Sequence, residues 1–221
     1  MNKKAILFCL ILFSSMAFAP HQTPMGGHEV CSIENTSFVA GERLVYKAYY
    51  NWKFVWIPAG EAVFDVIENK NDYEVRVIGK TYESYDYFFK VRDYFYSKID
   101  KTTLYPKNFV RIIEEGDYRK FDSISFDQVR RKAYSYNGKT RATAKLQQAN
   151  FDECMHDLLS VLYYLRNVNV DQYKKGTYIP TQVYFDNEKY PIKVRYEGRE
   201  QKKEIKELGT YNTVKVIPDL V

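Results

Sequence analysis

The sequence contains few of the residues and motifs on which enzymes usually depend. Its three histidines are His21, His28 and His156, and the first two lie in a polar N-terminal stretch without periodicity. Its only glycine doublet is Gly26-Gly27, so it has no glycine-rich loop of the kind that cradles phosphate. No serine or cysteine stands at a spacing from histidine that is typical of nucleophilic catalysis. We therefore assign no catalytic residue and no cofactor, and an enzyme is the weaker class of function.

Neither positive nor negative charge is concentrated in a long stretch of the chain. The 33 basic and 28 acidic residues give a formal net charge of +5. Bases and acids are interleaved along most of the sequence, whereas a nucleic-acid-binding surface needs a basic stripe. The one basic cluster, Arg130-Arg131-Lys132, is short and suits a hairpin edge, where charge discourages pairing with another strand. We do not expect nucleic acid as a partner.

Long hydrophobic runs are confined to the N-terminus. A basic start at Asn2-Lys3-Lys4 is followed by an apolar run over residues 5–13 and by the small-x-small site Ala17-Phe18-Ala19. Residues 1–19 are therefore a predicted signal peptide. Proline is poorly accepted directly after the cleavage site, and Pro20 follows Ala19. Cleavage at a neighbouring bond, or an uncleaved anchor, is therefore an alternative. Removal of the signal peptide lowers the net charge to about +3. We expect an exported protein of the bacterial periplasm or outer-membrane periphery, with no membrane span in the mature chain.

Cysteine is scarce, and the mature chain keeps two of the three residues. Cys9 lies within the predicted signal peptide, which leaves Cys31 and Cys154. An even pair in an oxidising compartment favours a disulfide. The alternative is a metal site that combines His28 and Cys31 with Cys154 and His156. Residues two apart on a helix point to different sides, so Cys154 and His156 would not converge on one ion. We expect the disulfide and no metal.

Residues 41–60, GERLVYKAYYNWKFVWIPAG, carry the clearest strand pattern. Aromatic and aliphatic residues alternate with the others from Leu44 to Trp52, which predicts a strand with one buried face. A break at Pro58-Ala59-Gly60 leads into a second strand at 59–68, and a third follows at 73–82 as an antiparallel meander. Further strands are predicted at 107–115, 118–126, 129–136, 139–147, 181–185, 192–196, 202–208 and 211–217. Tight turns are predicted at Asn137-Gly138 and Glu197-Gly198-Arg199.

A single helix is predicted over residues 153–166. Asp152 can accept the free amide protons of its first turn, and Cys154, Leu158, Val161, Leu162 and Leu165 form one apolar stripe. One helix among about ten strands argues against a parallel α/β fold. We therefore predict a mainly β protein, with an antiparallel, strongly curved sheet or incomplete barrel against which the helix packs. A flexible lead-in is expected at 20–40, and a single domain at 41–221.

The densest aromatic segment is residues 81–97, TYESYDYFFKVRDYFYS, with eight aromatic residues. Its centre at 88–93 breaks the alternation. A bulge or bend between two strands explains that break, and so does a surface loop that binds something. Packing is the simpler of the two explanations.

The sequence resembles domain-of-unknown-function family 3108, a group of exported bacterial proteins. The resemblance rests on Gly41-Glu42, Tyr49-Tyr50-Asn51-Trp52, the segment 88–93, and Cys154 with Asp157-Leu158-Leu159-Ser160. It implies a strand-rich, barrel-like exported domain without an established activity. Family members continue beyond the equivalent of Pro218-Asp219-Leu220-Val221, so the chain is expected to be a fragment. Whether the strands close into a barrel is then undecided, because the final strands would be missing.

The function expected from these observations is binding. The aromatic density of residues 82–96 favours a non-enzymatic envelope module or carrier for an apolar ligand such as lipid, or for a protein partner. A glycan-acting hydrolase with carboxylates from different strands, and a purely structural scaffold, remain as alternatives. The oligomeric state is left open. The candidate ligand-binding residues are Tyr50, Trp52, Trp56, Phe88, Phe89, Arg92 and Asp93.

Overall fold

The computed structural model describes residues 31–206 and 208–219, and everything below concerns that part of the chain. The predicted signal peptide, His21 and His28 lie outside it. Of the lead-in predicted at 20–40, residues 31–40 are described. They lie against the core through Phe38, whose ring packs edge-on against Tyr73 and Tyr163.

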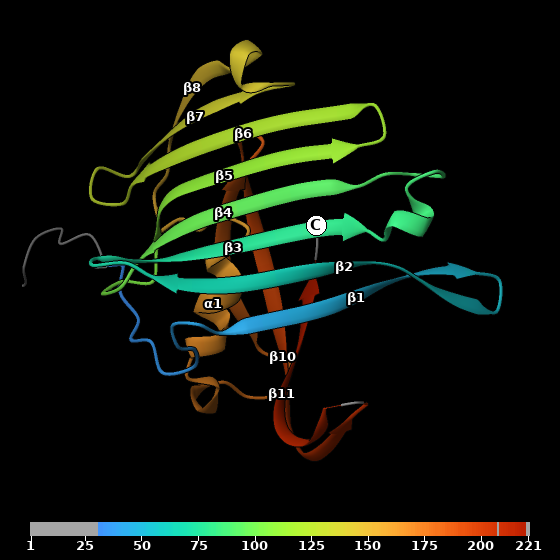
Figure 1. Ribbon diagram of the computed structural model, residues 1–221. Coiled ribbons are helices and arrows are strands. Elements are labelled where there is room, and N and C mark those ends of the chain that lie inside the picture. Colours follow the sequence, from blue (N-terminus) through green and yellow to red (C-terminus); the bar gives the residue numbers. More distant parts are fainter. Residues whose placement is uncertain (1–30, 207, 220–221) are drawn as a thin grey trace, which may run out of the picture. The chain divides into compact units, whose positions relative to one another are not determined.

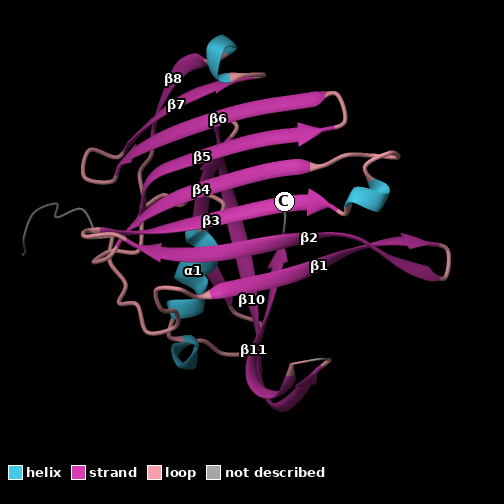
Figure 2. Cartoon of the chain, viewed as in Figure 1, coloured by secondary structure: helices cyan, strands magenta, loops and turns pink. Residues whose placement is uncertain are grey.

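Most of the described chain forms two antiparallel sheets (Figure 2). The larger sheet has eight strands in the order β1 to β8, so each strand pairs with its neighbour in sequence, and β1 and β8 are its edges. Its strands are β1 Arg43–Trp52, β2 Val55–Glu68, β3 Asp72–Thr81, β4 Arg92–Asp100, β5 Pro106–Glu115, β6 Tyr118–Asp127, β7 Lys132–Gly138 and β8 Lys145–Asn150. The prediction of a mainly β, antiparallel fold is confirmed.

The smaller sheet has three strands in the order β11-β10-β9, and β10 and β11 cross behind the larger sheet in the view of Figure 1. Its strands are β9 Tyr178–Phe185, β10 Glu188–Ile205 and β11 Gly209–Asp219. One α-helix is described, α1 Ser160–Asn167, with the short 3-10 turns η1 Glu83–Tyr85, η2 Arg141–Thr143 and η3 Val170–Gln172. No helix among residues 31–206 and 208–219 combines the length and apolar character needed to cross a bilayer.

The core lies on one face of the larger sheet, which we call the inner face. A row of register partners crosses this face, and every member is at most 2% exposed: Val66, Val75, Ser97, Phe109, Ile124 and Ser135. Met155, Leu159 and Tyr163, from α1 and the segment before it, belong to the same cluster as Tyr184 of β9. The inner face is therefore closed by α1 and by the smaller sheet.

A partly buried polar network also connects the two sheets. The two-residue turn after β9 places Asp186 beside β5 and β6, where its carboxylate lies 2.7 Å from Lys120 Nζ and accepts from Arg111 Nη2. Asn137 Nδ2 donates to the same carboxylate at 3.2 Å. Partial burial raises the pKa of Asp186, but the hydrogen bonds and positive charges of Lys120 and Arg111 outweigh it and hold the pKa below its ordinary value.

The predicted disulfide between Cys31 and Cys154 is confirmed. Their Cα atoms lie 5.7 Å apart, which is ordinary for a disulfide, and 123 residues separate them in sequence. Arg131 Nη1, from the β6–β7 turn, lies 2.9 Å from each sulfur atom. The bond therefore ties the start of the described chain to the segment that precedes α1.

The helix begins later than the sequence predicted. Residues 152–159 are not helical, because His156 pairs with β9: its N–H donates to Gln182 O at 2.8 Å, and its carbonyl accepts from Tyr184 N at 2.9 Å. The first helical turn is held by Asp157, whose Oδ1 accepts from the N–H groups of Leu159 and Ser160. The predicted start at residue 153 and the predicted cap, Asp152, were wrong because pairing with β9 replaces the first two helical turns.

One predicted break and two predicted turns fall on strand residues. Pro58 belongs to β2, near a register shift between Ala48 and Tyr49, where a missing backbone N–H is tolerated. Gly138 ends β7, and a side chain there would place Cβ 2.7 Å from Ala144 Cα, so the connection at 139–144 needs glycine. Gly198, with a φ of 107°, lies at a bulge within β10 and not at a turn between strands.

Candidate functional site

Three connections meet at one end of the larger sheet: the β1–β2 turn, residues 82–91 between β3 and β4, and the β5–β6 turn. Backbone hydrogen bonds join the middle connection to its neighbours on both sides. Tyr82 N donates to Ala59 O at 3.0 Å, and Gly116 N donates to Lys90 O at 2.8 Å. Figure 1 shows the β1–β2 turn and η1 at the same end of the strands.

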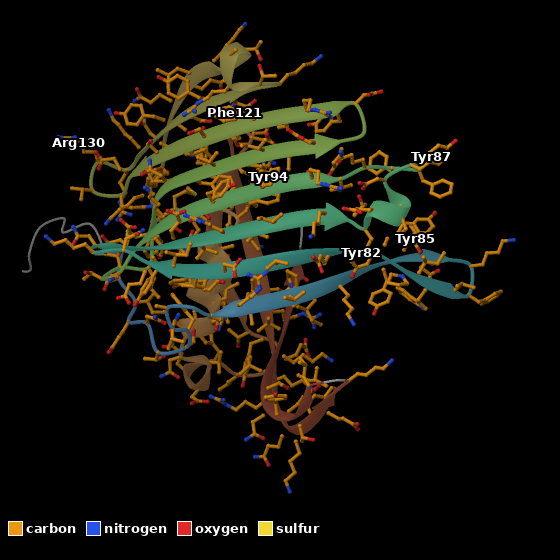
Figure 3. All side chains as sticks on the ribbon, viewed as in Figure 1. Tyr82, Tyr85, Tyr87, Tyr94, Phe121 and Arg130 are labelled. Carbon is orange, nitrogen blue, oxygen red and sulfur yellow. A yellow bond between two sulfur atoms is a disulfide. The ribbon has the colours of Figure 1, made fainter. Side chains whose placement is uncertain are left out.

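This end carries a group of large apolar side chains that are exposed to solvent. Phe54 and Tyr87 are 96% and 93% exposed, the highest values for large apolar residues in the described chain. The group, which we call the aromatic end, consists of Tyr49, Tyr50, Phe54, Val55, Trp56, Tyr87, Phe88, Phe89 and Tyr118. Figure 3 shows Tyr87 pointing outward beyond η1, and Tyr82 and Tyr85 on the side toward the hairpin. The number of exposed large apolar side chains at this end is unusual, because extensive exposed apolar surface on a protein usually marks an interaction site.

The β1–β2 hairpin is exposed because it extends beyond its neighbour. Strand β2 pairs with β3 only from Gly60 onward, so residues 55–58 pair with β1 alone. Trp52 pairs with Val55, which leaves Lys53 and Phe54 as a two-residue turn, with Lys53 at a left-handed φ of 57°. A two-stranded ribbon has no layer against either face, so its aromatic side chains stay in solvent.

The 82–91 connection is held in place by an ion pair at its base. The Arg92 guanidinium donates to both carboxylate oxygens of Asp86, and Thr81 Oγ1 donates to Asp86 Oδ1 at 2.6 Å. The hydrogen bond from Arg92 lowers the pKa of the Asp86 carboxyl. The Phe89 ring packs on the β5–β6 turn, since a Cβ on Gly116 would lie 3.2 Å from it. The exposed rings therefore lie on a loop whose position is fixed by these contacts.

The structure places the predicted ligand-binding residues in different environments. Tyr50 and Trp56 lie on the hairpin ribbon, and Phe88 and Phe89 lie in the 82–91 connection; all four are exposed. Trp52 ends β1, and its side chain is not described. The other two predicted residues make contacts within the protein. Arg92 forms an ion pair with Asp86 of the 82–91 connection, and Asp93 lies beside Glu115 of β5. The aromatic residues share one end of the sheet but stand on separate turns.

Asp93 and Glu115 form a carboxyl pair across β4 and β5. Burial and the neighbouring Glu115 raise the pKa of Asp93 to about 6, although Glu114 N donates to Asp93 Oδ1 at 3.1 Å. The two side chains are within hydrogen-bonding reach of each other. Glycosidases hold their two carboxyl groups about 5–9.5 Å apart, to admit a sugar or a water molecule. The pair is too close for that chemistry, so the geometry does not favour the hydrolase alternative.

This pair leads to a pH-dependent prediction. The folded-state pKa of Asp93 lies above its ordinary value of 3.8, so the wild-type protein gains stability as pH falls from 7 toward 4. Asp93→Asn keeps the oxygen that accepts from Glu114 N and removes the repulsion. We expect its Tm to exceed that of the wild type by roughly 2–4 °C at pH 8, with the difference disappearing near pH 4. Calorimetry across this range measures the effect, with Asp117→Asn in the adjacent turn as the control; a lower Tm for Asp93→Asn at pH 8 would contradict it.

A histidine, an aspartate and a serine also meet at the start of α1, but they are enclosed. His156, Asp157 and Ser160 are each at most 1% exposed, and His156 Nδ1 lies 3.2 Å from Ser160 Oγ. Ser160 Oγ accepts from Asp157 N, and the His156 ring stacks on Tyr105 at 4.2 Å. Burial lowers the pKa of His156 to about 3, so it is neutral at physiological pH. Without access for a substrate, this group is structural, and His156 lies before α1 and not within the helix predicted over residues 153–166.

The described residues contain no cluster of three histidine, cysteine or acidic side chains that could hold a metal ion. The metal site considered from the sequence involved Cys31 and Cys154, whose sulfur atoms are joined to each other. A disulfide does not offer the thiolate that a metal requires.

Several residues of the aromatic end were missed by sequence reasoning: Tyr49, Phe54, Val55, Tyr87 and Tyr118. A signal for the hairpin was present, because Lys53-Phe54 sits in the middle of an aromatic run and divides it into two segments of similar length. The predicted break at Pro58 concealed it, since it placed the turn several residues too late.

Comparison with known proteins identifies the family. No curated protein and no solved structure matches the chain significantly. The family model described as "Protein of unknown function (DUF3108)" matches residues 45–220, which include the hairpin, the 82–91 connection and both sheets. The chain belongs to this family.

Proposed function

We propose that the protein is a non-enzymatic envelope module that docks reversibly on a lipid surface through its aromatic end. The observation that carries this proposal is the exposure of nine large apolar side chains on three connections and on the adjoining strand residues, at one end of the larger sheet. Export to the periplasm or the outer-membrane periphery, as expected from residues 1–19, is part of the proposal because it brings the chain to such a surface.

The residue types of the aromatic end suit the interface between lipid and water. Tyrosine and tryptophan have an apolar ring with a polar group at its edge, and they concentrate at the headgroup level of membranes. Phe54 and Phe88 are wholly apolar and lie near the tips of their turns, where they reach deepest. Lys53 and Lys90 are exposed beside them and can meet anionic headgroups.

The expected affinity is modest. Full burial of one large apolar side chain contributes about 1.5–3 kcal/mol, whereas association costs about 4–15 kcal/mol in lost freedom. Immersion of four or five rings therefore supports reversible docking without permanent anchoring. Within this proposal, the larger sheet is the strongly curved, incomplete barrel expected from the sequence, and it acts as a rigid base for the hairpin and the loop.

Vesicle flotation tests the proposal. Purified protein is mixed with vesicles of phosphatidylethanolamine and phosphatidylglycerol, and the protein that floats with lipid is measured. We expect Phe54→Ser combined with Phe88→Ser to weaken lipid binding at least roughly tenfold, because both rings enter the lipid. The fold should be unaffected, since both side chains are exposed.

The matched control is Val39→Ser combined with Val129→Ser, because both valines are exposed and lie at the opposite end of the strands. The control variant is expected to float like the wild type. Equal flotation of all three proteins, or none by the wild type, would contradict lipid docking and would direct attention to a protein partner at the same end.

A further inference from the structure

The outward face of the larger sheet, opposite the core, has an apolar centre. Strand register places Tyr94, Ile112 and Phe121 in one row of this face. The next row holds Tyr96, Val110, Ser123, Tyr136 and Leu146. A sheet that covers a core with one face usually presents polar residues on the other. Figure 3 labels Tyr94 and Phe121 on this sheet, well away from Tyr87 at the aromatic end.

Two adjoining hollows lie over β5, β6 and β7 on this face. One, of about 320 Å³, is bordered by Val110, Ile112 and Phe121 and by residues 139–141. The other, of about 340 Å³, is bordered by Phe121, Ser123, Tyr136 and Arg141. Because they share Phe121, Ser123 and Arg141, we treat them as one space and call it the β5–β6 groove. Each hollow has the size of a small-molecule site.

The side of the groove is formed by the β7–β8 connection, which has a defined conformation. Thr140 N donates to Thr143 Oγ1 at 3.1 Å, and Thr143 N donates to Thr140 O at 3.1 Å. The close approach of Ala144 to Gly138 brings the chain back over the end of β7. Lys139 and Arg141 are thereby held at the border of an apolar floor.

The border of the groove has an excess of positive charge. Within residues 31–206 and 208–219, Lys139 and Arg141 have no carboxylate partner, and Arg119 donates only to the carbonyls of Gly116 and Tyr118. Lys120 is neutralised by Asp186 on the inner face. Glu114 is the one acid among the lining residues. An apolar floor beside uncompensated cations fits a ligand with an apolar chain and an anionic headgroup.

We propose that the β5–β6 groove binds one anionic amphiphile, with its acyl chain over Phe121 and Ile112 and its headgroup at Lys139 and Arg141. This site uses different residues from the aromatic end and does not depend on lipid docking there. The carboxylate of a fatty acid and the phosphate of a phospholipid share the required chemistry.

Titration calorimetry below the critical micelle concentration tests the site. Dodecanoate and dodecyl phosphate are expected to bind with saturation at one per chain, and the tighter of the two identifies the headgroup source. Acetate, which lacks the chain, and dodecyltrimethylammonium, which has the opposite charge, are expected to bind at least roughly tenfold more weakly. Equal binding of acetate or of the cationic amphiphile would overturn the proposal.

Variants locate the binding. Lys139→Gln combined with Arg141→Gln should weaken dodecanoate binding roughly tenfold or more, whereas Lys174→Gln combined with Lys175→Gln, the same change of charge elsewhere, should not. Ser123→Trp should fill the groove and abolish binding while far-ultraviolet circular dichroism stays native. Phe54→Ser combined with Phe88→Ser should bind dodecanoate normally even where vesicle flotation is lost. Unchanged affinity in both groove variants would refute the site.

Discussion

Replacement of both Cys31 and Cys154 by serine is expected to lower the free energy of unfolding by about 4–5 kcal/mol. The reason is the length of the closed loop, since 123 residues separate the two cysteines and the bond removes many conformations from the unfolded chain. For a protein whose total stability is of the order of 5–15 kcal/mol, this is a large share.

Urea unfolding, followed by circular dichroism, measures this loss. Wild-type protein unfolded in the presence of a thiol reductant serves as a second route to the same state, and its midpoint should approach that of the double variant. A loss below about 1 kcal/mol in both experiments would show that the bond does not restrain the unfolded chain in this way.

The second large effect is expected at Asp157. Its carboxylate is fully buried and accepts from Ser97 Oγ, Leu159 N and Ser160 N, so it joins β4 to the first turn of α1. Asp157→Ala leaves these buried donors without an acceptor, and we expect a loss of about 3–4 kcal/mol. Asp157→Asn keeps an oxygen for the two backbone N–H groups and should lose about 1 kcal/mol.

The matched control for Asp157→Ala is Asp152→Ala. Asp152 is the residue that the sequence favoured as the helix cap, but it is exposed and five residues from that role. Its replacement should change stability by less than about 0.5 kcal/mol. If denaturant unfolding shows that Asp152→Ala costs more than Asp157→Ala, the position of the cap described above is wrong.

Much of the architecture could be predicted from local pattern. Alternation identified the strands of the β1–β3 meander to within a few residues, although β2 begins four residues earlier than predicted. The buried face predicted for the first strand was wrong, because β1 is an edge strand and its residues 45–51 are exposed on both faces. The disulfide followed from the number of cysteines and the expected compartment. The start of α1 could not be predicted, because the competing partner of residues 152–159 is β9, which lies more than twenty residues later in sequence.

Only part of the candidate site could be predicted, because the rest depends on contacts between segments that are distant in sequence. The sequence showed that aromatic residues gather at 49–56 and 82–96, but exposure depends on which strands lie alongside them. Phe54 and Phe88 are exposed because β3 does not accompany β2 to its first residues and because η1 turns the chain away from β4. The β5–β6 groove needed register across three strands and the path of residues 139–144, neither of which the sequence specifies.

The most direct test of lipid docking is the fluorescence of the tryptophans. The chain contains only Trp52 and Trp56, and both belong to the β1–β2 hairpin, so intrinsic emission reports on the aromatic end alone. On addition of vesicles, we expect the emission to shift to shorter wavelength and to be quenched by lipids brominated on their acyl chains. An unshifted spectrum without quenching, at lipid concentrations that saturate flotation, would contradict the proposal that this end enters the membrane.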